Sequence, residues 1–236
     1  MSNNYKFHNP EGLYFISFAI VGWLDVFIRN EYRDLFIESL EYCQKDKGLE
    51  IHAWCIMSSH VHLVFKSIGG QNPELLIGDL KRFTSSAIVK CIKENPKESR
   101  KEFLLNFFRT EAEKSSNVNQ YQFWRHDNKP IELWSNKVIK QKIDYVHNNP
   151  VDAGLVFNAE DYVYSSAIDY AGGREIIDNV VVFRMFDFNN FDYSAGASIL
   201  LVPLLLININ FQNRIIIVAI ISGTAIFPIN GVSYKT

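Results

Sequence analysis

Short apolar runs in the first third of the chain predict β-strands. Residues 14–22 are rich in β-branched and aromatic side chains, residues 49–56 alternate between apolar and polar, and residues 60–66 follow after a three-residue link. The last two runs are therefore expected to pair as a hairpin. Between the first two runs, apolar residues recur at helical spacing from Asn30, a residue typical of N-caps, to Gly48, a residue typical of helix ends.

Helical spacing returns in two later segments. Residues 73–95 predict one helix, and residues 135–148 predict another that Pro150 is expected to end. Residues 121–134 are aromatic and expected to be extended, and residues 150–156 predict a turn that leads into a short strand. The buried stripe of the first of these helices is expected to consist of Leu76, Leu80, Phe83, Ala87, Ile88 and Cys91.

The order strand, helix, strand, strand, helix, strand indicates an α+β protein. It is the order of the ferredoxin-like split βαβ arrangement, an antiparallel sheet, here with an added C-terminal helix. In that arrangement the first and third strands are central, so the strand of residues 60–66 is predicted to lie inside the sheet. Its face away from the apolar core is expected to be open to a later helix.

Composition and charge limit the classes of function. The chain has 236 residues, 47% hydrophobic, which suits one folded domain with room for an appendage. A formal net charge of −2 excludes nucleic-acid binding by bulk electrostatics. Residues 81–114 contain nine basic and five acidic residues and could form a local basic surface. A solvated helix face explains this excess of basic residues equally well.

Cysteine usage and the start of the chain indicate a cytoplasmic setting. The three cysteines, Cys43, Cys55 and Cys91, are widely spaced and form no Cys-x-x-Cys pattern, so neither a zinc knuckle nor a disulfide framework is indicated. The first residues lack the basic and apolar regions of a secretory signal.

Two pairs of polar residues carry candidate chemistry. In an extended strand, His60 and His62 project from the same face, where two neutral imidazoles can bind one metal ion if a third ligand arrives. On the helix of residues 135–148, Tyr145 lies about 120° from the buried stripe, with Asn149 one turn further on the same side. The alternatives are two ordinary strand histidines and an ordinary surface tyrosine.

Together these motifs resemble a known family, the single-tyrosine HUH transposases, in the branch of REP-associated tyrosine transposases. Residues 57–64 (MSSHVHLV) resemble the HUH motif, and residues 145–151 (YVHNNPV) resemble the segment that carries the nucleophile. Further similarity to this branch lies in Trp124, Trp134 and residues 153–156 and 161–167. The resemblance covers about residues 8–175.

The resemblance implies an enzyme that cleaves and rejoins single-stranded DNA through a 5′-phosphotyrosine intermediate. It implies an HUH endonuclease-type fold whose added helix is catalytic, with Tyr145 as nucleophile and His60, His62 and Asn149 as metal ligands. The expected cofactor is a divalent ion, Mg²⁺ or Mn²⁺, although the donor set is also compatible with Zn²⁺. The expected partner is single-stranded DNA that can contain a hairpin, with the protein a monomer or homodimer and no membrane partner.

Two other functions remain open at this stage. One is a non-catalytic nucleic-acid-binding module of the same fold, which would not need the tyrosine together with both histidines. The other is a metal-dependent phosphodiester hydrolase that uses water as nucleophile. Further residues are also open to two interpretations: His52 and His147 are possible members of the site, and Trp54, Trp124 and Trp134 belong either to the core or to a surface that stacks on unpaired bases.

The resemblance stops near residue 177, and the remaining chain differs in composition. We therefore expect a domain of residues 1–177 and an atypical apolar tail of residues 178–236. The apolar runs 199–207 and 215–221 are each too short to span a bilayer, and Arg214 lies between them. Extra strands, a membrane-associated hairpin and a frameshift product are the three explanations, and a frameshift product fits the abrupt change best.

Overall fold

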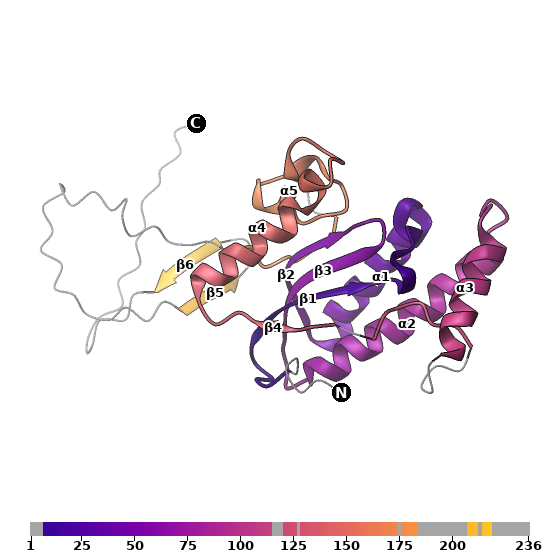
Figure 1. Ribbon diagram of the computed structural model, residues 1–236. Coiled ribbons are helices and arrows are strands. Elements are labelled where there is room, and N and C mark those ends of the chain that lie inside the picture. Colours follow the sequence, from indigo (N-terminus) through magenta and orange to yellow (C-terminus); the bar gives the residue numbers. More distant parts are fainter. Residues whose placement is uncertain are drawn as a thin grey trace, which may run out of the picture. The chain divides into compact units, whose positions relative to one another are not determined.

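The computed structural model describes residues 7–114, 120–126, 128–173, 176–183, 207–211 and 214–218. Its centre is a four-stranded antiparallel sheet in the order β2-β3-β1-β4 (Figure 1). The strands are β1 (Leu13–Ala19), β2 (Leu49–Ile56), β3 (His60–Ser67) and the two-residue β4 (Ile131–Glu132). Because β3 lies between β1 and β2, the split βαβ arrangement and the central position of the histidine strand are both confirmed.

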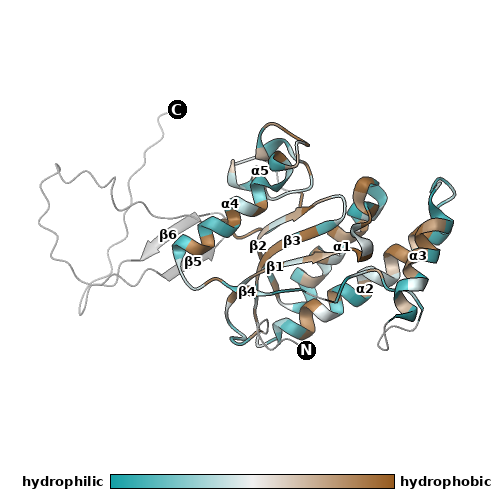
Figure 2. Ribbon diagram, in the orientation of Figure 1, coloured by the Kyte–Doolittle hydropathy of each residue, from teal (hydrophilic) through white to brown (hydrophobic). Residues whose placement is uncertain are grey.

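One face of the sheet packs against α1 (Asn30–Lys47) and α2 (Pro73–Glu94). Val61, Leu63 and Phe65 of β3 are fully buried in this core. The helix ends follow the sequence signals, since Gly48 ends α1 with a φ of 70° and Asn72 caps α2 by accepting the Glu74 and Leu75 N–H groups. Figure 2 shows β3 mainly in the colour of hydrophobic residues, whereas α2 alternates between hydrophobic and hydrophilic colours.

The opposite face of the sheet is covered by α4 (Asn136–Asp152). Ile143 and Val146 of this helix pack on Phe15 and Val64 of the two central strands. The chain then continues through η3 (Ala159–Asp161) and the short α5 (Ala167–Tyr170). The sheet is therefore the middle of three layers, with α1 and α2 on one face and α4 on the other (Figure 1).

Several expected boundaries were wrong. Helix α4 continues past Pro150 to Asp152, because a proline in the last turn lacks one N–H while its fixed φ suits a helix. The chain remains tied there by the Ala153 N–H to the Asn149 carbonyl at 3.0 Å and by the Leu155 N–H to the Pro150 carbonyl at 2.9 Å. Residues 155–156 form no strand.

The basic segment also differs from expectation. It contains a separate helix, α3 (Lys101–Glu113), whose Leu104 and Phe108 are buried. On α2, Phe83 of the expected buried stripe is 61% exposed. The first strand, β1, ends at Ala19; Ile20 forms an isolated bridge to Trp124, and residues 21–22 belong to a 3₁₀ turn, η1 (Val21–Trp23).

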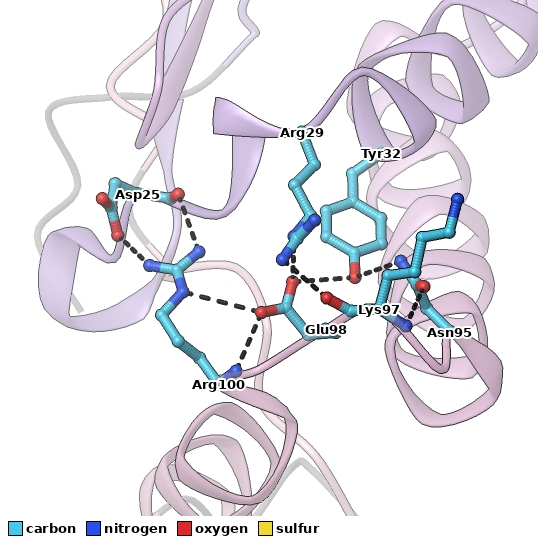
Figure 3. A network of polar contacts seen from close by, with 7 residues as sticks. All are labelled: Asp25, Arg29, Tyr32, Asn95, Lys97, Glu98 and Arg100. Atoms are coloured by element: carbon cyan, nitrogen blue, oxygen red, sulfur yellow. Dashed lines mark hydrogen bonds and ion pairs between the residues drawn. The ribbon is translucent and has the colours of Figure 1, made fainter.

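A polar network around Glu98 fixes the loop between α2 and α3 (Figure 3). The buried Glu98 carboxylate pairs with Arg29 Nε at 2.7 Å and accepts the Arg100 backbone N–H at 3.0 Å and the Tyr32 hydroxyl at 3.1 Å. Arg100 also pairs with Asp25 at 2.6 Å. Burial alone raises the pKa of Glu98, but these hydrogen bonds outweigh it and the pKa lies below its ordinary value. Arg100 and Arg29 are thus occupied in holding the fold.

The first compact unit, Met1–Met185, continues beyond residue 177, since the Val181 N–H donates to the Ile51 carbonyl at 2.8 Å. In the second, Phe186–Thr236, the described residues form β5 (Ile207–Phe211) paired antiparallel with β6 (Arg214–Val218). Most of the expected apolar tail lies outside the described residues, so its boundary and its origin as a frameshift product stay predictions. Among the described residues no helix is long and apolar enough to cross a membrane.

Candidate active site

The two histidines stand on a strand whose backbone is fixed from both sides. His60 and His62 pair with Ala19 and Ser17 of β1, and β2 pairs with the other edge of β3. The three-residue link before β3 is held by hydrogen bonds of 2.9 Å from the Ile20 N–H to the Ser59 carbonyl and from the Phe27 N–H to the Ser58 carbonyl. The two imidazole centroids lie 4.7 Å apart on the face that α4 covers.

Helix α4 brings Tyr145 to this pair. Because Ile143 and Val146 are buried against the sheet, Tyr145 lies at the side of the helix and is 44% exposed. Its ring meets the edge of His62 at 5.1 Å between centroids and that of Phe15 at 5.8 Å. Phe15 in turn stacks on His62 at 5.7 Å. The phenol therefore faces both the imidazole and the solvent.

The Asn149 side chain, one turn after Tyr145, lies beside both imidazoles. Burial lowers the pKa of both imidazoles. The pKa of His62 falls to about 3, because the neighbouring His60 and Lys142 charges add to the effect of burial. The Asn149 amide opposes the shift in both rings. Both imidazoles are therefore neutral at pH 7, the form that binds a metal ion. The structure thus brings His60, His62, Tyr145 and Asn149 into one cluster.

The orientation of His60 depends on a residue that the sequence analysis missed. The Ser59 hydroxyl lies 3.2 Å from Nδ1 of His60. Because this hydrogen bond occupies Nδ1, Nε2 is the ring nitrogen that remains to bind a metal ion. In the sequence, the only signal was the position of Ser59 next to His60.

The donor set fits a divalent ion. Neither ring nitrogen of the buried His62 has a hydrogen-bond partner within the described part of the chain, and an unpaired buried polar atom is costly unless a ligand uses it. The described residues contain no cluster of three His, Cys, Asp or Glu side chains, so a third protein ligand here would be the Asn149 amide. Two imidazole nitrogens and one amide oxygen leave coordination positions for other oxygens.

Lys142 supplies a positive charge next to the same cluster. Its Nζ lies 4.8 Å from the centre of the Phe15 ring and 5.4 Å from that of Tyr145. The spacing of three residues between Lys142 and Tyr145 places them on one side of a helix, so the sequence did contain a signal for this neighbour. A cation beside an exposed phenol and two imidazoles suits an anionic group such as a phosphodiester.

Comparisons with known proteins indicate the family that the chain resembles. Residues 25–122 match the family model described as "Transposase IS200 like". The chain is 28% identical over 172 residues to a putative REP-associated tyrosine transposase of Haemophilus influenzae, covering 70% of this chain and 85% of that protein. The chain is therefore similar to the REP-associated tyrosine transposases over about 70% of its length. The resemblance expected from the HUH and tyrosine motifs is thereby confirmed, and the family is one of enzymes.

The fold of this chain is also found in a solved structure. That structure is of a REP-associated tyrosine transposase bound to a REP hairpin, with a TM-score of 0.54 and 17% sequence identity. The similarity covers 85% of this chain and 99% of the other. The residues that the family model matches include His60 and His62 but not Tyr145 and Asn149.

Two other histidines, His52 and His147, lie outside the cluster. Nε2 of His52 lies 3.0 Å from Oε1 of Glu50 on the same strand. Nε2 of His147 lies 2.9 Å from Oγ of Ser166, and its ring packs on Tyr170. Both side chains therefore have local structural partners.

The tryptophans divide between core and surface. Trp54 is fully buried, and Trp124 is buried with its Nε1 donating to Oγ1 of Thr84 at 3.0 Å. Trp134 is 81% exposed just before α4. A fourth, Trp23, was not considered from the sequence, and it lies against His60 with 5.4 Å between ring centroids. Of the three tryptophans expected either to stack on bases or to fill the core, two are in the core.

Proposed function

We propose that this chain cleaves and rejoins single-stranded DNA, with Tyr145 as the nucleophile and with His60, His62 and Asn149 holding a divalent ion, Mg²⁺ or Mn²⁺. The observation that carries the proposal is the buried His62 imidazole, whose ring nitrogens have no hydrogen-bond partner among the described residues, in edge contact with the exposed Tyr145 ring. Neither a core histidine nor a surface tyrosine needs this arrangement.

The proposed reaction exchanges one phosphodiester for another. The Tyr145 oxygen attacks phosphorus, and the bond from phosphorus to the 3′ oxygen breaks. One DNA fragment leaves with a free 3′ hydroxyl, and the other fragment stays linked to the tyrosine through its 5′ phosphate. The phenol loses its proton during the attack, and the leaving 3′ oxygen gains one. Attack by another 3′ hydroxyl on the phosphotyrosine reverses the step and rejoins the DNA without an energy source.

The residues of the chain divide the work by position. Strand β3 fixes the two imidazoles, Ser59 orients His60, and α4 holds Tyr145 and Asn149 on the same side of the sheet. A bound divalent ion would supply positive charge to the non-bridging oxygens of the phosphate. The Lys142 ammonium adds a second charge beside the phenol.

A hairpin next to the cleaved strand is the partner that we propose. Support comes from the solved relative with the same fold, which was bound to a REP hairpin. The net charge of −2 agrees with recognition by a local surface instead of the whole protein. Whether one or two copies of the chain bind the hairpin is part of the test below.

A covalent trapping assay tests this proposal. Single-stranded oligonucleotides from the flanks of the gene, hairpins included, carry a 3′ fluorophore so that the label stays with the tyrosine-linked fragment. They are incubated with Mn²⁺, Mg²⁺ or a chelator and separated on a denaturing gel. Light scattering of the complex gives the number of protein copies.

We expect a metal-dependent labelled protein band that is absent in Tyr145→Phe and in His62→Ala. Tyr42→Phe is the matched control, since Tyr42 is similarly exposed, at 52%, on α1. Cleavage without an adduct in Tyr145→Phe would instead show a hydrolase that uses water. Binding with neither cleavage nor adduct in the wild type would show a non-catalytic DNA-binding module.

A further inference from the structure

Trp23 occupies a backbone conformation that a bulky residue rarely adopts. It ends the turn η1 that follows β1, with a φ of 55°, and its N–H donates to the Ile20 carbonyl at 3.0 Å. Its side chain is 53% exposed. A positive φ costs free energy for a large side chain, and such strain gathers at functional positions.

The turn that presents Trp23 is firmly attached. The Val21 N–H donates to the Phe123 carbonyl and the Arg125 N–H to the Ala19 carbonyl, both at 2.9 Å. Gly22, which directly precedes Trp23, has a φ of 65°, and a Cβ at that position would lie 2.5 Å from the Phe107 ring. The indole is therefore held at a fixed place.

That place lies between a candidate metal ligand and a cation. The Trp23 ring meets the His60 ring at an angle of 73°. On the Trp23 ring lies the Arg125 guanidinium, with its Cζ 5.5 Å from the ring centre. The buried Trp54 and Trp124 have no comparable exposure. Trp134 is exposed, but the described part of the chain shows no ring contact between it and either candidate histidine.

We propose that Trp23 stacks on an unpaired base next to the phosphate that is cleaved, while Arg125 contacts the adjoining phosphate. An exposed indole gives a flat surface to any base, and a guanidinium beside it suits the DNA backbone. Because the Trp23 and His60 ring centroids are 5.4 Å apart, a base stacked on Trp23 would lie next to the candidate metal site. This inference rests on the proposed function, and it makes Trp23 a positioning residue.

The test compares DNA with and without bases. Binding of the full chain to fluorescent oligothymidylate, about twelve nucleotides long, is measured by anisotropy beside an abasic strand of the same length. Trp23→Asn removes the ring with a residue that tolerates positive φ, and Trp23→Phe keeps a smaller ring. Arg125→Ala removes the cation, and Trp134→Ala is the control for loss of an exposed tryptophan.

We expect Trp23→Asn to bind oligothymidylate about 5- to 150-fold more weakly. Trp23→Phe should retain part of this affinity, and binding of the abasic strand should not change. Arg125→Ala should weaken both strands, whereas Trp134→Ala should weaken neither. Equal losses on both strands in Trp23→Asn, or no loss on either, would overturn the inference.

Fluorescence gives a second measurement that needs no variant at Trp23. In Trp134→Phe the two remaining tryptophans besides Trp23 are buried, so quenching by oligothymidylate reports on Trp23. We expect quenching by oligothymidylate and none by the abasic strand; equal quenching by the two would count against stacking.

The two proposals fail in different assays. An adduct on Tyr145 together with unchanged oligothymidylate binding by Trp23→Asn would overturn the stacking role alone. A base preference that depends on Trp23 without any adduct would overturn the proposed cleavage alone.

Discussion

The His62 imidazole and the Tyr145 phenol ring lie in edge contact across two layers of the fold. Their ring centroids are 5.1 Å apart, yet His62 is 2% exposed and Tyr145 is 44% exposed. The pair therefore joins a buried, rigid strand to a side chain that a polymer can reach from solvent. The position of the phenol depends on how α4 packs on β3, so packing and chemistry can be tested by separate substitutions.

The first prediction concerns Ser59, which orients His60. Ser59→Ala should weaken Mn²⁺ binding about 10- to 100-fold, because the imidazole loses the partner that orients its ring. Isothermal titration measures this affinity. The neighbouring Ser58→Ala is the control, and an equal effect of both substitutions would indicate damage to the link before β3 instead.

The second prediction concerns the charge of Lys142. Lys142→Gln should slow formation of the covalent adduct about 10- to 100-fold under single-turnover conditions, because a cation no longer faces the developing negative charge. Affinity for the oligonucleotide should fall by much less.

Lys140→Gln provides the comparison for Lys142. Lys140 pairs with Asp144 at 2.5 Å on the exposed side of the same helix, so its loss should leave the adduct rate nearly unchanged. If both lysine variants slow the reaction alike, the effect of Lys142 is one of net charge and not of position.

The third prediction compares two glycines with positive φ, Gly154 and Gly22, in order to separate backbone strain from steric clash. Gly154→Ala places a side chain at a φ of 69° in open space, and it should lower the free energy of unfolding by about 1–2 kcal/mol. Gly22→Ala has nearly the same φ but meets the Phe107 ring, so it should cost about 1–3 kcal/mol more.

Urea unfolding measures both glycine variants. Adding Phe107→Ala to Gly22→Ala should remove the clash, so the double variant should lose less stability than the two single losses combined. Additive losses would mean that Phe107 and Gly22 do not meet.

The fourth prediction is the pH dependence of stability that His147 produces. Burial lowers the pKa of this imidazole to about 4, whereas in the unfolded chain it is about 6.5. As the pH falls below about 6.5 the unfolded state binds the proton first, so stability drops by up to about 1.4 kcal/mol per pH unit until about pH 4.

His147→Gln tests the assignment, because an amide can still bond to Ser166 but does not titrate. Urea unfolding between about pH 7 and pH 5 should show a shallower slope in this variant, with the remainder due to His52, His60 and His62, whose pKa values burial also lowers. An unchanged slope would place the titrating group elsewhere.

The parts of the fold that follow from local rules could be predicted from the sequence. The alternation through His60 and His62 gave their shared face, and Gly48 and Asn72 marked helix ends by their own chemistry. Tyr145 and Asn149 followed from helical spacing alone. The roles of these four site residues stay a prediction.

The remaining features depend on contacts between distant segments. Nothing near Trp23 in the sequence indicates His60 as its neighbour, because that contact follows from the pairing of Ala19 with His60 across two strands. Helix α3 takes its place from Phe108, whose ring packs on Phe123 far along the chain. The prediction that Pro150 ends the helix was wrong because the effect of a proline depends on its position, and Pro150 lies in the last turn of α4.

Helix α4 both carries the candidate nucleophile and covers one face of the sheet, which has a consequence for synthesis on the ribosome. Until residues 136–152 have emerged, Phe15 and Val64 have no cover on that face, and the histidines have no tyrosine beside them. The nascent chain therefore acquires this cover and its candidate nucleophile in the same event. An incomplete chain that stops before α4 lacks Tyr145 and exposes an apolar face that makes it prone to aggregation.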